Sequence, residues 1–498
     1  MKKALRFICI LLSVILLLTS LGCGSEGTED TEETGTPVGT ADPEQSAETD
    51  APETTIVHAR QEISDELPAV SFDGNDFLIM GCYPDHAENV VVEELNGENF
   101  NDAIFRRNSG LNERFNTRIQ YTTGGVSHHD NATALIEKTI LAGDSDAFDL
   151  IMYHFVASSG NAVKGLYLNW YDIPDIHFEK PWWSSSNTED LTVNGRCFLA
   201  IGDVSIRAIH DIYCIIYNKD AITDNQEEPL YPVVKNGGWT LDYVRSLSER
   251  VYRDVNGNGI EDAGDYFGLL SDNGSNLNAF YWAGGNKVLT KTGDALELTF
   301  FNENTVRTYE KTKSLIYGSG VDFQNDPNVA MNEKFLNYQS LMIVACIGQT
   351  RTKMGNYEHE YGVLPLPKLA EEQEAYCSMV DGGSEMMAVG KSAVNLKFIG
   401  IMTEALCAES YKTVQPVYYD ECLKMRYSTS PEDAEMIELC RNSCVYDLGY
   451  IYDNWKGLGF LFLQCLQNQS DIASSYEAKK AAAEKYYWEK VLAVFEGE

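Results

Sequence analysis

Apolar runs typical of buried strands alternate with helix-like patterns in the first part of the chain. Residues 77–81, 118–122 and 148–153 are short and rich in apolar or β-branched side chains, which favours strands. Residues 101–116 and 132–142 repeat apolar side chains every three to four positions, which favours helices buried on one face. The order strand, helix, strand, helix, strand predicts a mostly parallel sheet covered by helices.

A second series of the same kind begins with a predicted strand at residues 212–218. It continues with a helix over 241–252, for which Thr240 is the expected N-cap, and with a strand over 267–271. The sequence also predicts strands at 339–347 and 361–366, a hairpin at 287–301 with Thr292-Gly293-Asp294 at its turn, a helix that starts at Ser430 and Pro431, and a long helix over 474–495. Two α/β units on one chain favour a ligand cleft between two lobes.

The first 22 residues have the pattern of an export signal. Three basic residues precede an apolar run over 7–18, and small residues follow it. The run is too short for a permanent membrane span, so we expect a cleaved signal; an uncleaved membrane anchor is the alternative. Leu21-Gly22-Cys23 resembles the bacterial lipoprotein signal, in which the cysteine is acylated and becomes the new N-terminus. The resemblance implies lipidation at Cys23 and a protein held at the extracellular face of the cell membrane.

Residues 23–65 predict an acidic, disordered tether. Residues 24–55 contain ten Asp or Glu and no Lys or Arg, and most of the rest is Thr, Gly, Ser, Ala and Pro. Such a segment cannot bury enough apolar surface to offset the entropy of ordering. We therefore expect the folded part of the chain to begin near residue 66.

The charge of the chain limits its partners. It has 38 Lys or Arg and 75 Asp or Glu, a net charge of −37. The phosphates of nucleic acids and of anionic lipid surfaces would be repelled, so we expect no nucleic-acid partner. The charge does not argue against a neutral ligand.

Ten of the twelve cysteines lie outside the export signal and Cys23. They are scattered, with no CxxC pair and no zinc-ligand spacing. Several, such as Cys214 and Cys346, lie within apolar runs, so buried free thiols are the favoured interpretation. An extracellular location also permits disulfides, which the sequence alone does not pair.

Residues 254–265 resemble a calcium-binding loop of the EF-hand type. Oxygen-bearing side chains fall at loop positions 1, 3, 5, 9 and 12, a glycine falls at position 6, and position 7 would supply a backbone carbonyl. The expected ligands are Asp254, Asn256, Asn258, Ile260, Asp262 and Asp265. Asp265 stands where glutamate is usual, as in dockerin-type loops. We expect a structural calcium ion that ties the helix over 241–252 to the next strand; a turn without metal is the alternative.

The chain lacks the common signatures of catalytic sites. Gly382-Gly383-Ser384-Glu385-Met386 fails at the last glycine of a nucleophile elbow, and His128-His129-Asp130 lacks the spacing of a zinc-protease helix. Acidic pairs are too common in this chain to indicate a glycosidase by themselves. We therefore expect a protein that is not an enzyme and that needs no organic cofactor.

Three aromatic clusters lie beside glycine and short polar residues, a combination that suits sugar rings. They are Pro181-Trp182-Trp183, Phe280-Tyr281-Trp282 and Tyr452-Asp453-Asn454-Trp455. An aromatic ring stacks on the apolar face of a sugar, while amides and carboxylates bind its hydroxyls. Burial in the core is the alternative for each tryptophan.

From about residue 70 to its end, the chain resembles a family 1 extracellular solute-binding protein of bacterial ABC importers. The resemblance is carried by the order of short pieces along the chain. They include Asp149-Leu150-Ile151-Met152-Tyr153, Pro181-Trp182-Trp183, Gly202-Asp203-Val204-Ser205, Tyr217-Asn218-Lys219-Asp220, Trp239-Thr240-Leu241-Asp242 and Tyr361-Gly362-Val363-Leu364-Pro365-Leu366-Pro367-Lys368.

The resemblance implies a two-lobed, periplasmic-binding-protein-like α/β fold (type II) whose lobes close on ligand around hinge crossings. Lobe 1 would comprise residues 66–208 with 366–412, and lobe 2 would comprise 209–365 with 413–498. By analogy with the family, Tyr153, His154, Asp381 and Trp455 would contact the ligand, and so would the region of Gly348. The aromatic clusters add Trp182, Trp183 and Trp282 to the candidate ligand contacts.

The resulting expectation is a monomeric, lipid-anchored protein that captures a sugar or oligosaccharide outside the cell and delivers it to the transmembrane subunits of an ABC permease. No covalent chemistry is needed, because closure follows from contacts that both lobes make only when ligand lies between them. A peptide- or amino-acid-binding lipoprotein, a cell-surface carbohydrate-active enzyme and a surface adhesion module are the alternatives.

Overall fold

The computed structural model describes residues 60–324, 329–423 and 430–497. The export signal over 1–22, the lipidation residue Cys23 and the tether up to residue 59 lie outside these residues. Within the described part of the chain, no helix is both long and apolar enough to cross a membrane.

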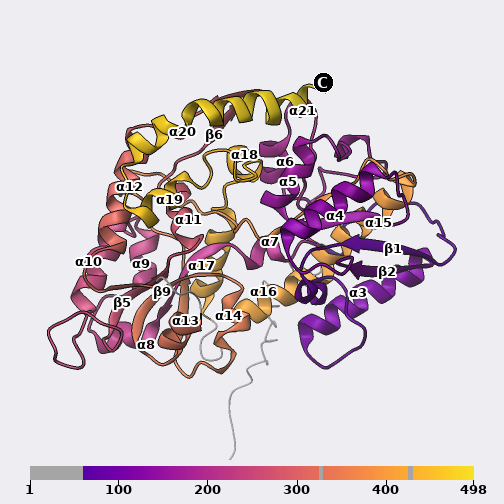
Figure 1. The fold of residues 1–498 in the computed structure, drawn as a ribbon. Helices are drawn as coiled ribbons and strands as arrows, with labels where there is room; N and C mark the ends of the chain where they lie inside the picture. The colour runs from indigo at the N-terminus through magenta and orange to yellow at the C-terminus, as the bar shows by residue number, and fades with distance from the viewer. Residues whose placement is uncertain (1–59, 325–328, 424–429, 498) are drawn as a thin grey trace, which may run out of the picture. The chain divides into compact units, whose positions relative to one another are not determined.

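The first sheet has four strands in the order β11-β3-β1-β2. Figure 1 labels β1 and β2 of this sheet. The strand β1 (Asn75–Met80) is parallel to β2 (Thr117–Thr122) and to β3 (Leu150–His154), while β11 (Glu385–Ala388) is antiparallel to β3. The helices α3 (Asn99–Phe115) and α4 (His129–Leu141) connect the three parallel strands. The mostly parallel sheet expected from residues 77–153 is confirmed.

The helix α3 shows how the apolar spacing becomes packing. Ile104, Leu111 and Phe115 are all buried, as the pattern predicts. Full burial of a side chain of this size stabilises a fold by roughly 1.5–3 kcal/mol. Asn116 then ends the helix with a φ of 46°, a left-handed conformation that asparagine adopts more readily than most residues.

The second sheet has five strands in the order β10-β4-β9-β5-β8. The strand β4 (Tyr213–Asn218) is antiparallel to both of its neighbours, β9 (Ser340–Cys346) and β10 (Tyr361–Leu364). The strand β5 (Phe267–Asp272) is parallel to β9 and to β8 (Val321–Gln324). The carboxyl ends of β5 and β9 and the amino end of β4 therefore meet at one edge of this sheet.

The hairpin expected at 287–301 forms as a separate two-stranded sheet of β6 (Leu289–Thr292) and β7 (Ala295–Leu298). Thr240 caps α10 (Leu241–Val251), and Ser430 and Asp433 form a capping box at α17 (Pro431–Asn442). The expected C-terminal helix is α20 (Ile472–Tyr486), a π-helical segment over Tyr487–Leu492 and α21 (Ala493–Glu496). The other α-helices are α5 (Phe155–Val163), α6 (Ser185–Leu191), α7 (Arg207–His210), α8 (Lys219–Asp224), α9 (Leu230–Lys235), α11 (Asn276–Ala283), α12 (Glu303–Ile316), α13 (Val329–Leu336), α14 (Gln349–Thr352), α15 (Leu396–Glu409), α16 (Gln415–Leu423), α18 (Leu448–Ile451) and α19 (Leu461–Asn468).

Two chain segments run side by side where the backbone passes between the two sheets. Ile212 and Val380 form an isolated antiparallel bridge, and the Asp381 backbone N–H donates to the Asp211 carbonyl at 3.0 Å. Just before this crossing, Lys368 makes backbone hydrogen bonds with Trp239 and Leu241 of the second series. The exact lobe boundaries given above remain a prediction, and these contacts show where the chain connects the sheets.

Candidate ligand-binding site

A cavity of about 400 Å³ opens at the edge of the second sheet where β4, β5 and β9 meet. The carboxyl ends of parallel strands are where ligands bind in open α/β sheets. Its polar lining consists of Tyr213, Asp272, Ser275, Asn276, Asn332, Gln349 and Asp381. Among the described residues, no lysine, arginine or histidine lines this cavity.

Two amide oxygens in this cavity have no hydrogen-bond donor among the described residues. They are Asn276 Oδ1 and Gln349 Oε1, and both atoms are buried. The amide nitrogen of Asn276 donates to Ser271 Oγ at 3.1 Å, which fixes the side chain at the carboxyl end of β5. A buried acceptor without a donor is costly, so a ligand that brings hydroxyl or N–H donors would be stabilised here.

Two carboxylates add further acceptors. Burial raises the pKa of both Asp272 and Asp381 above the usual aspartate value. Asp272 Oδ1 accepts from the Gly274 backbone N–H at 2.7 Å, and Asp381 accepts from the Tyr213 hydroxyl and from the Gly383 N–H. Asp381 directly follows Val380, a residue of the crossing segment, and precedes β11 of the first sheet. Its carboxylate nevertheless lines the cavity at the edge of the second sheet.

A group of aromatic and imidazole rings adjoins the Asp381 loop. The Trp455 ring stacks on His129 with centroids 5.3 Å apart, and its centroid lies 5.7 Å from that of His154. The backbone next to His154 is joined to the loop over residues 381–384, because the N–H of Phe155 donates to the Ser384 carbonyl at 3.0 Å. Burial, followed by the neighbouring imidazole of His129, lowers the pKa of His154 to about 3. The imidazole of His154 is therefore uncharged at neutral pH.

A tight turn presents Trp455. Asn454 and Trp455 have φ values of 43° and 55°, a conformation that non-glycine residues rarely adopt. Asp453 holds the turn by accepting from the Gly459 N–H at 2.7 Å and from the Tyr487 hydroxyl at 3.2 Å. The result is a tryptophan that remains 47% exposed in a part of the chain where most large rings are buried.

A buried ionic group lies beside the crossing. Arg207 donates to both carboxylate oxygens of Asp211, at 2.9 and 3.0 Å, and His210 Nδ1 lies 2.9 Å from Asp211 Oδ1. Although burial opposes it, the Arg207 guanidinium holds the pKa of Asp211 below the usual value. The positive charge of Arg207 is thus neutralised within the protein.

The sequence-predicted tryptophans outside the 452–455 cluster are buried. Trp182 and Trp183 donate their indole N–H groups to the two carboxylate oxygens of Glu404 at 2.8 and 2.9 Å. Trp282 donates to Asp447 at 3.0 Å. All three rings are at most 3% exposed, so the structure does not bring them to the cavity.

Tyr153 is also fully buried, and its hydroxyl lies 3.0 Å from Thr133 Oγ1. Of the predicted ligand contacts, the structure thus brings His154, Asp381 and Trp455 together around one loop. Tyr213, Asp272 and Asn276 complete the cavity together with Gln349, which follows Gly348 directly; the first three were not predicted. The signal that could have indicated them is their position at strand ends on one edge of the sheet.

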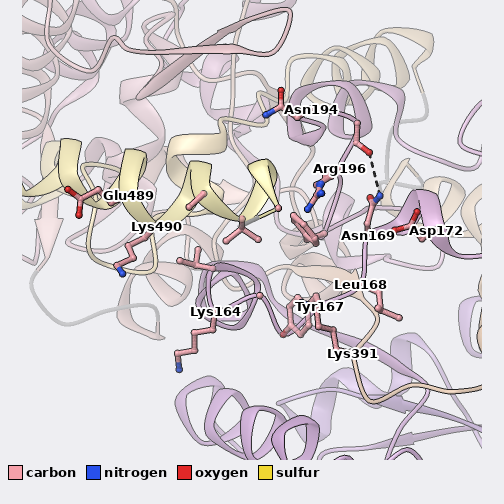
Figure 2. A pocket seen from close by; sticks show the side chains of 17 residues that line it. Lys164, Tyr167, Leu168, Asn169, Asp172, Asn194, Arg196, Lys391, Glu489 and Lys490 are labelled. Carbon is pink, nitrogen blue, oxygen red and sulfur yellow. Dashed lines mark hydrogen bonds between the residues drawn. The ribbon is translucent and has the colours of Figure 1, made fainter.

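A larger cavity, of about 630 Å³, lies between α5 and the end of the C-terminal helix (Figure 2). Its charged lining is Lys164, Asp172, Arg196, Lys391, Glu489 and Lys490. The lysines are exposed, and no buried acceptor without a donor lines this cavity in the described residues. We therefore place the candidate site at the smaller cavity beside the crossing.

The calcium-like loop has the hydrogen bonds of an ordered turn. The N–H groups of Gly257 and Gly259 donate to the two Asp254 oxygens at 2.6 and 2.7 Å, and the Asn258 N–H donates to Asn256 Oδ1 at 3.0 Å. Asn258 Oδ1 accepts from the Ile260 N–H at 2.7 Å. These bonds hold the side-chain oxygens close to the loop backbone.

Asp262 joins the same loop side chains. Its carboxylate accepts from the amides of Asn256 at 3.1 Å and Asn258 at 2.6 Å, so three predicted ligands converge. Asp265 differs, because its oxygens already accept from the Val255 and Asp262 N–H groups and from the Tyr252 hydroxyl. An all-oxygen donor set of this kind fits a hard cation such as calcium.

Nine of the cysteines in the described part of the chain are free thiols. Burial raises the pKa of Cys82 and of Cys197 to about 12, and it raises the pKa of Cys214 still further. Such thiols are unreactive, because the thiolate is the nucleophilic form. Within this part of the chain, the favoured interpretation of buried free thiols holds for most of the cysteines.

Three solved structures illustrate the similarity of the fold, and the first of them is described as an ABC substrate-binding protein. Lmo0181 from Listeria monocytogenes, in complex with cycloalternan, matches with a TM-score of 0.54 at 13% identity over 83% of this chain and 99% of that chain. UgpB from Mycobacterium tuberculosis, in complex with glycerophosphocholine, gives 0.55 at 13% identity over 83% and 99%. A cyclo/maltodextrin-binding protein complexed with maltotetraose gives 0.53 at 13% over 83% and 97%.

These matches show that the chain has a periplasmic-binding-protein-like α/β fold over most of its length. No protein-family model matches the sequence, and no curated protein matches it either. The expected fold class is therefore confirmed. At 13% sequence identity the matches do not identify the ligand, which has to be inferred from the residues of the site.

Proposed function

We propose that this chain captures an uncharged carbohydrate outside the cell and delivers it to an ABC permease. The observation that carries the proposal is the cavity at the edge of the second sheet, where Asp272, Asn276, Gln349 and Asp381 supply acceptors. Sugar hydroxyls are donors, and the exposed ring of Trp455 suits the apolar face of a sugar. The complexes of two structural neighbours with cycloalternan and maltotetraose support this ligand class.

The charges at the site favour an uncharged ligand over a phosphodiester. Two aspartates line the cavity, and Arg207, whose charge acts on Asp381, is already paired with Asp211. A phosphate group, such as that of the glycerophosphocholine bound by UgpB, would meet carboxylates with no free cation among the lining residues. A ligand with an ammonium group, such as an amino acid or peptide, is the second class that acceptors could hold.

The position of the site supports a protein that closes on its ligand. Asp381 lies beside the crossing segments, while Asp272 and Gln349 belong to the second sheet's side. A ligand that hydrogen-bonds to both groups favours the conformation in which they approach each other. Our proposal includes the lipid anchor at Cys23, a monomeric state and a structural calcium ion in the loop over 254–265.

The test is a binding titration on the full chain. Tryptophan fluorescence and calorimetry should show saturable binding of one oligosaccharide from a panel of malto-, cello- and cyclic oligosaccharides, and chromatography should recover that sugar unchanged. Binding of peptides alone would favour the second class of ligand. Release of shorter sugars would favour a carbohydrate-active enzyme and would overturn the proposal.

Substitutions at the cavity make the test specific. Gln349→Met keeps the size of the side chain but removes the unpartnered acceptor, so the sugar loses a hydrogen bond worth about 1 kcal/mol, or roughly fivefold in affinity. Asp381→Asn should cost more, since bonds to a charged acceptor contribute about 1.5–3 kcal/mol. Glu113→Gln, on an exposed position of α3, is the matched control and should leave the affinity unchanged.

A further inference from the structure

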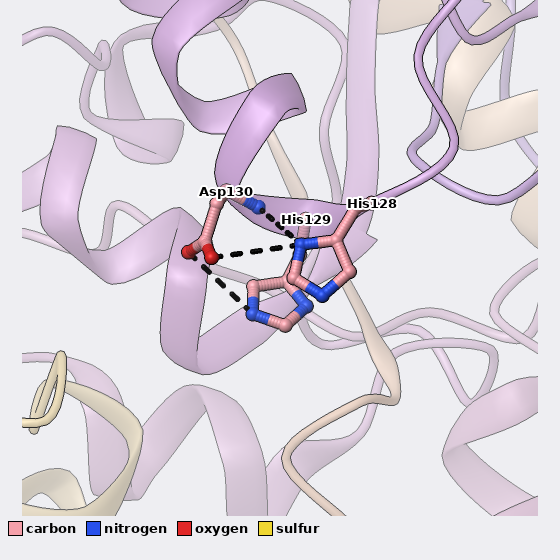
Figure 3. Close-up of side chains that lie close together, drawn as sticks. All are labelled: His128, His129 and Asp130. Atoms are coloured by element: carbon pink, nitrogen blue, oxygen red, sulfur yellow. Dashed lines mark hydrogen bonds and ion pairs between the residues drawn. The ribbon is translucent and has the colours of Figure 1, made fainter.

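The amino end of α4 carries three consecutive side chains of metal-ligating type (Figure 3). One ligand atom from each of His128, His129 and Asp130 lies within 4.8 Å of the other two. The sequence pattern excludes a zinc-protease helix here, and the site is separate from the calcium-like loop. What remains to be explained is why two imidazoles and a carboxylate face one another.

His129 is held as a metal-ligating histidine would be. Its Nδ1 atom lies 2.9 Å from the hydroxyl of Tyr83, so its Nε2 atom is the nitrogen that faces Asp130. In metal sites the ligating histidine commonly makes a hydrogen bond through its other ring nitrogen, which fixes the orientation of the ring. Stacking against Trp455 restrains the same ring from the side.

The spacing of the three groups is longer than hydrogen bonds and suits a shared ion. His128 Nδ1 lies 3.5 Å from Asp130 Oδ2, and His129 Nε2 lies 3.6 Å from Asp130 Oδ1. Hydrogen bonds between nitrogen and oxygen are usually about 2.7–3.2 Å long. Two ligands on a tetrahedral zinc ion, each bonded at about 2.1 Å, are separated by roughly 3.4 Å.

We propose that His128, His129 and Asp130 bind a divalent transition-metal ion of the zinc, copper or nickel type. Two imidazole nitrogens and one carboxylate favour these ions over calcium or magnesium, which prefer oxygen ligands. Three protein ligands leave at least one coordination position for water or for a group of a bound solute. The proposal does not depend on the carbohydrate function.

The site is accessible from solvent and adaptable enough to take up an ion. The side chains of His128 and Asp130 are 53% and 71% exposed, while that of His129 is 17% exposed. His128 Nδ1 also accepts a long hydrogen bond of 3.4 Å from the Asp130 N–H, which a metal bond would replace. His154 stays outside the ligand set, because, of the described residues, only His128, His129 and Asp130 place one ligand atom each within 4.8 Å of the other two.

Trp455 provides the optical signal for the test, since its ring centroid is 5.3 Å from that of His129. The full chain, without a polyhistidine tag and in excess calcium to saturate the 254–265 loop, is titrated with Cu²⁺ while tryptophan fluorescence is recorded. One equivalent should quench the fluorescence to a plateau, and Zn²⁺ should compete. Trp455→Phe should remove most of the quenching while calorimetry still detects one bound Zn²⁺.

Ligand substitutions decide the assignment. His128→Asn, Asp130→Asn and His129→Gln should each weaken Zn²⁺ binding at least tenfold. The first two, both at exposed positions, should not lower the melting temperature, and asparagine at position 128 can still cap α4. His359→Asn, whose histidine pairs with Asp220 elsewhere in the fold, is the matched control and should bind as the parent chain does. Unchanged Zn²⁺ affinity in His128→Asn and Asp130→Asn, or no saturable binding in the parent chain, would overturn the proposal.

Discussion

The ring of Trp455 lies nearly parallel to the imidazole of His129, with centroids 5.3 Å apart and an interplanar angle of 25°. This contact joins the turn after α18 to the start of α4, two segments that lie far apart in the sequence. On the other side of the turn, Asn454 approaches α5 so closely that a Cβ on Gly160 would lie 2.9 Å from the Asn454 amide nitrogen. The C-terminal part of the chain thus delivers an aromatic ring to the first sheet's side of the site.

Removing that ring should weaken ligand binding. Trp455→Ala is expected to lower the affinity for the captured sugar by about 1–3 kcal/mol, or roughly 5- to 150-fold, because stacking and apolar burial are both lost. The residue is 47% exposed, so the free energy of unfolding should change little. Calorimetric titration measures the affinity, and chemical denaturation measures the stability.

A matched aromatic control is available in Trp239. This ring is fully buried and donates its indole N–H to the Pro365 carbonyl at 2.9 Å. Trp239→Phe should lower the free energy of unfolding while leaving the affinity of the folded protein unchanged. The placement of Trp455 in the site would be refuted if its removal left the affinity at the parental value.

Replacing either of two glycines by alanine should change the free energy of unfolding, but in opposite directions. A Cβ on Gly268 of β5 would lie 2.2 Å from the Ser248 Cα of α10, whereas a Cβ on Gly110 of α3 meets no atom within 4 Å. Gly268→Ala should destabilise the fold by about 1–3 kcal/mol or more, because the helix and strand must separate. Gly110→Ala should stabilise it by roughly 0.5–1 kcal/mol, since glycine weakens a helix. Urea denaturation of both variants checks this, and a destabilised Gly110→Ala would contradict it.

Much of the fold could be predicted because its elements have strong local patterns. The strand expected at 118–122 forms as β2, and the hairpin turn forms at Gly293, whose φ is 61°. The start of α4 was predicted three residues late, because its cap is the imidazole of His128 rather than a common capping residue. Predicted and observed helix ends differ here because local hydrogen bonds decide where a helix begins, and the spacing of apolar residues does not indicate those bonds.

The site was harder to predict, because its residues come together only through the strand order. Asp272 is the last residue of β5, Asn276 follows this strand, and Gln349 follows β9; nothing in the local sequence shows that these strands are neighbours. The buried tryptophans illustrate the same limit. Trp182 binds Glu404, a carboxylate 222 residues away, so its sequence context of serine and proline did not reveal that its polar partner is internal.

The buried carboxylate of Asp203 predicts a dependence of stability on pH. Its Oδ2 atom has no donor among the described residues, and burial raises its pKa from 3.8 to about 7 although Arg441 and Arg60 oppose the shift. Between these pH values the folded chain holds a proton that the unfolded chain has released. The stability that this group contributes is therefore complete below about pH 3.8 and is lost as the pH rises through 7.

Asp203→Asn should remove this loss. At pH 5, where part of this loss has already occurred, the variant should be more stable than the parent by about 1.5 kcal/mol, and at pH 8 it should be more stable by about 4 kcal/mol. Burial also raises the pKa of Glu404 and of Asp453 to about 7. These two groups make the free energy of unfolding depend on pH in the parent and in the variant alike. Urea denaturation at both pH values gives the difference, with Glu113→Gln as the control. An equal gain at pH 5 and pH 8 would show that titration of Asp203 is not its cause.

The loop over 254–265 predicts a stabilisation that depends on calcium. If calcium binds only the folded chain, a concentration a hundred times the Kd adds about 2.7 kcal/mol and raises the melting temperature. Asp254→Asn should abolish this increase, because position 1 supplies a charged ligand. Asp265→Asn should lower the melting temperature even in chelator, since Asp265 accepts hydrogen bonds from Val255, Asp262 and Tyr252 without any metal.

Differential scanning calorimetry in EDTA and in calcium measures both effects. Magnesium at the same concentration is the control for ionic strength, and Glu113→Gln is the control for loss of a carboxylate outside the loop. Identical melting curves of the parent chain in EDTA and calcium would exclude the calcium site. Even in that case we expect Asp265→Asn to have a lower melting temperature in EDTA than the parent chain, because this variant removes hydrogen bonds that close the loop onto β5.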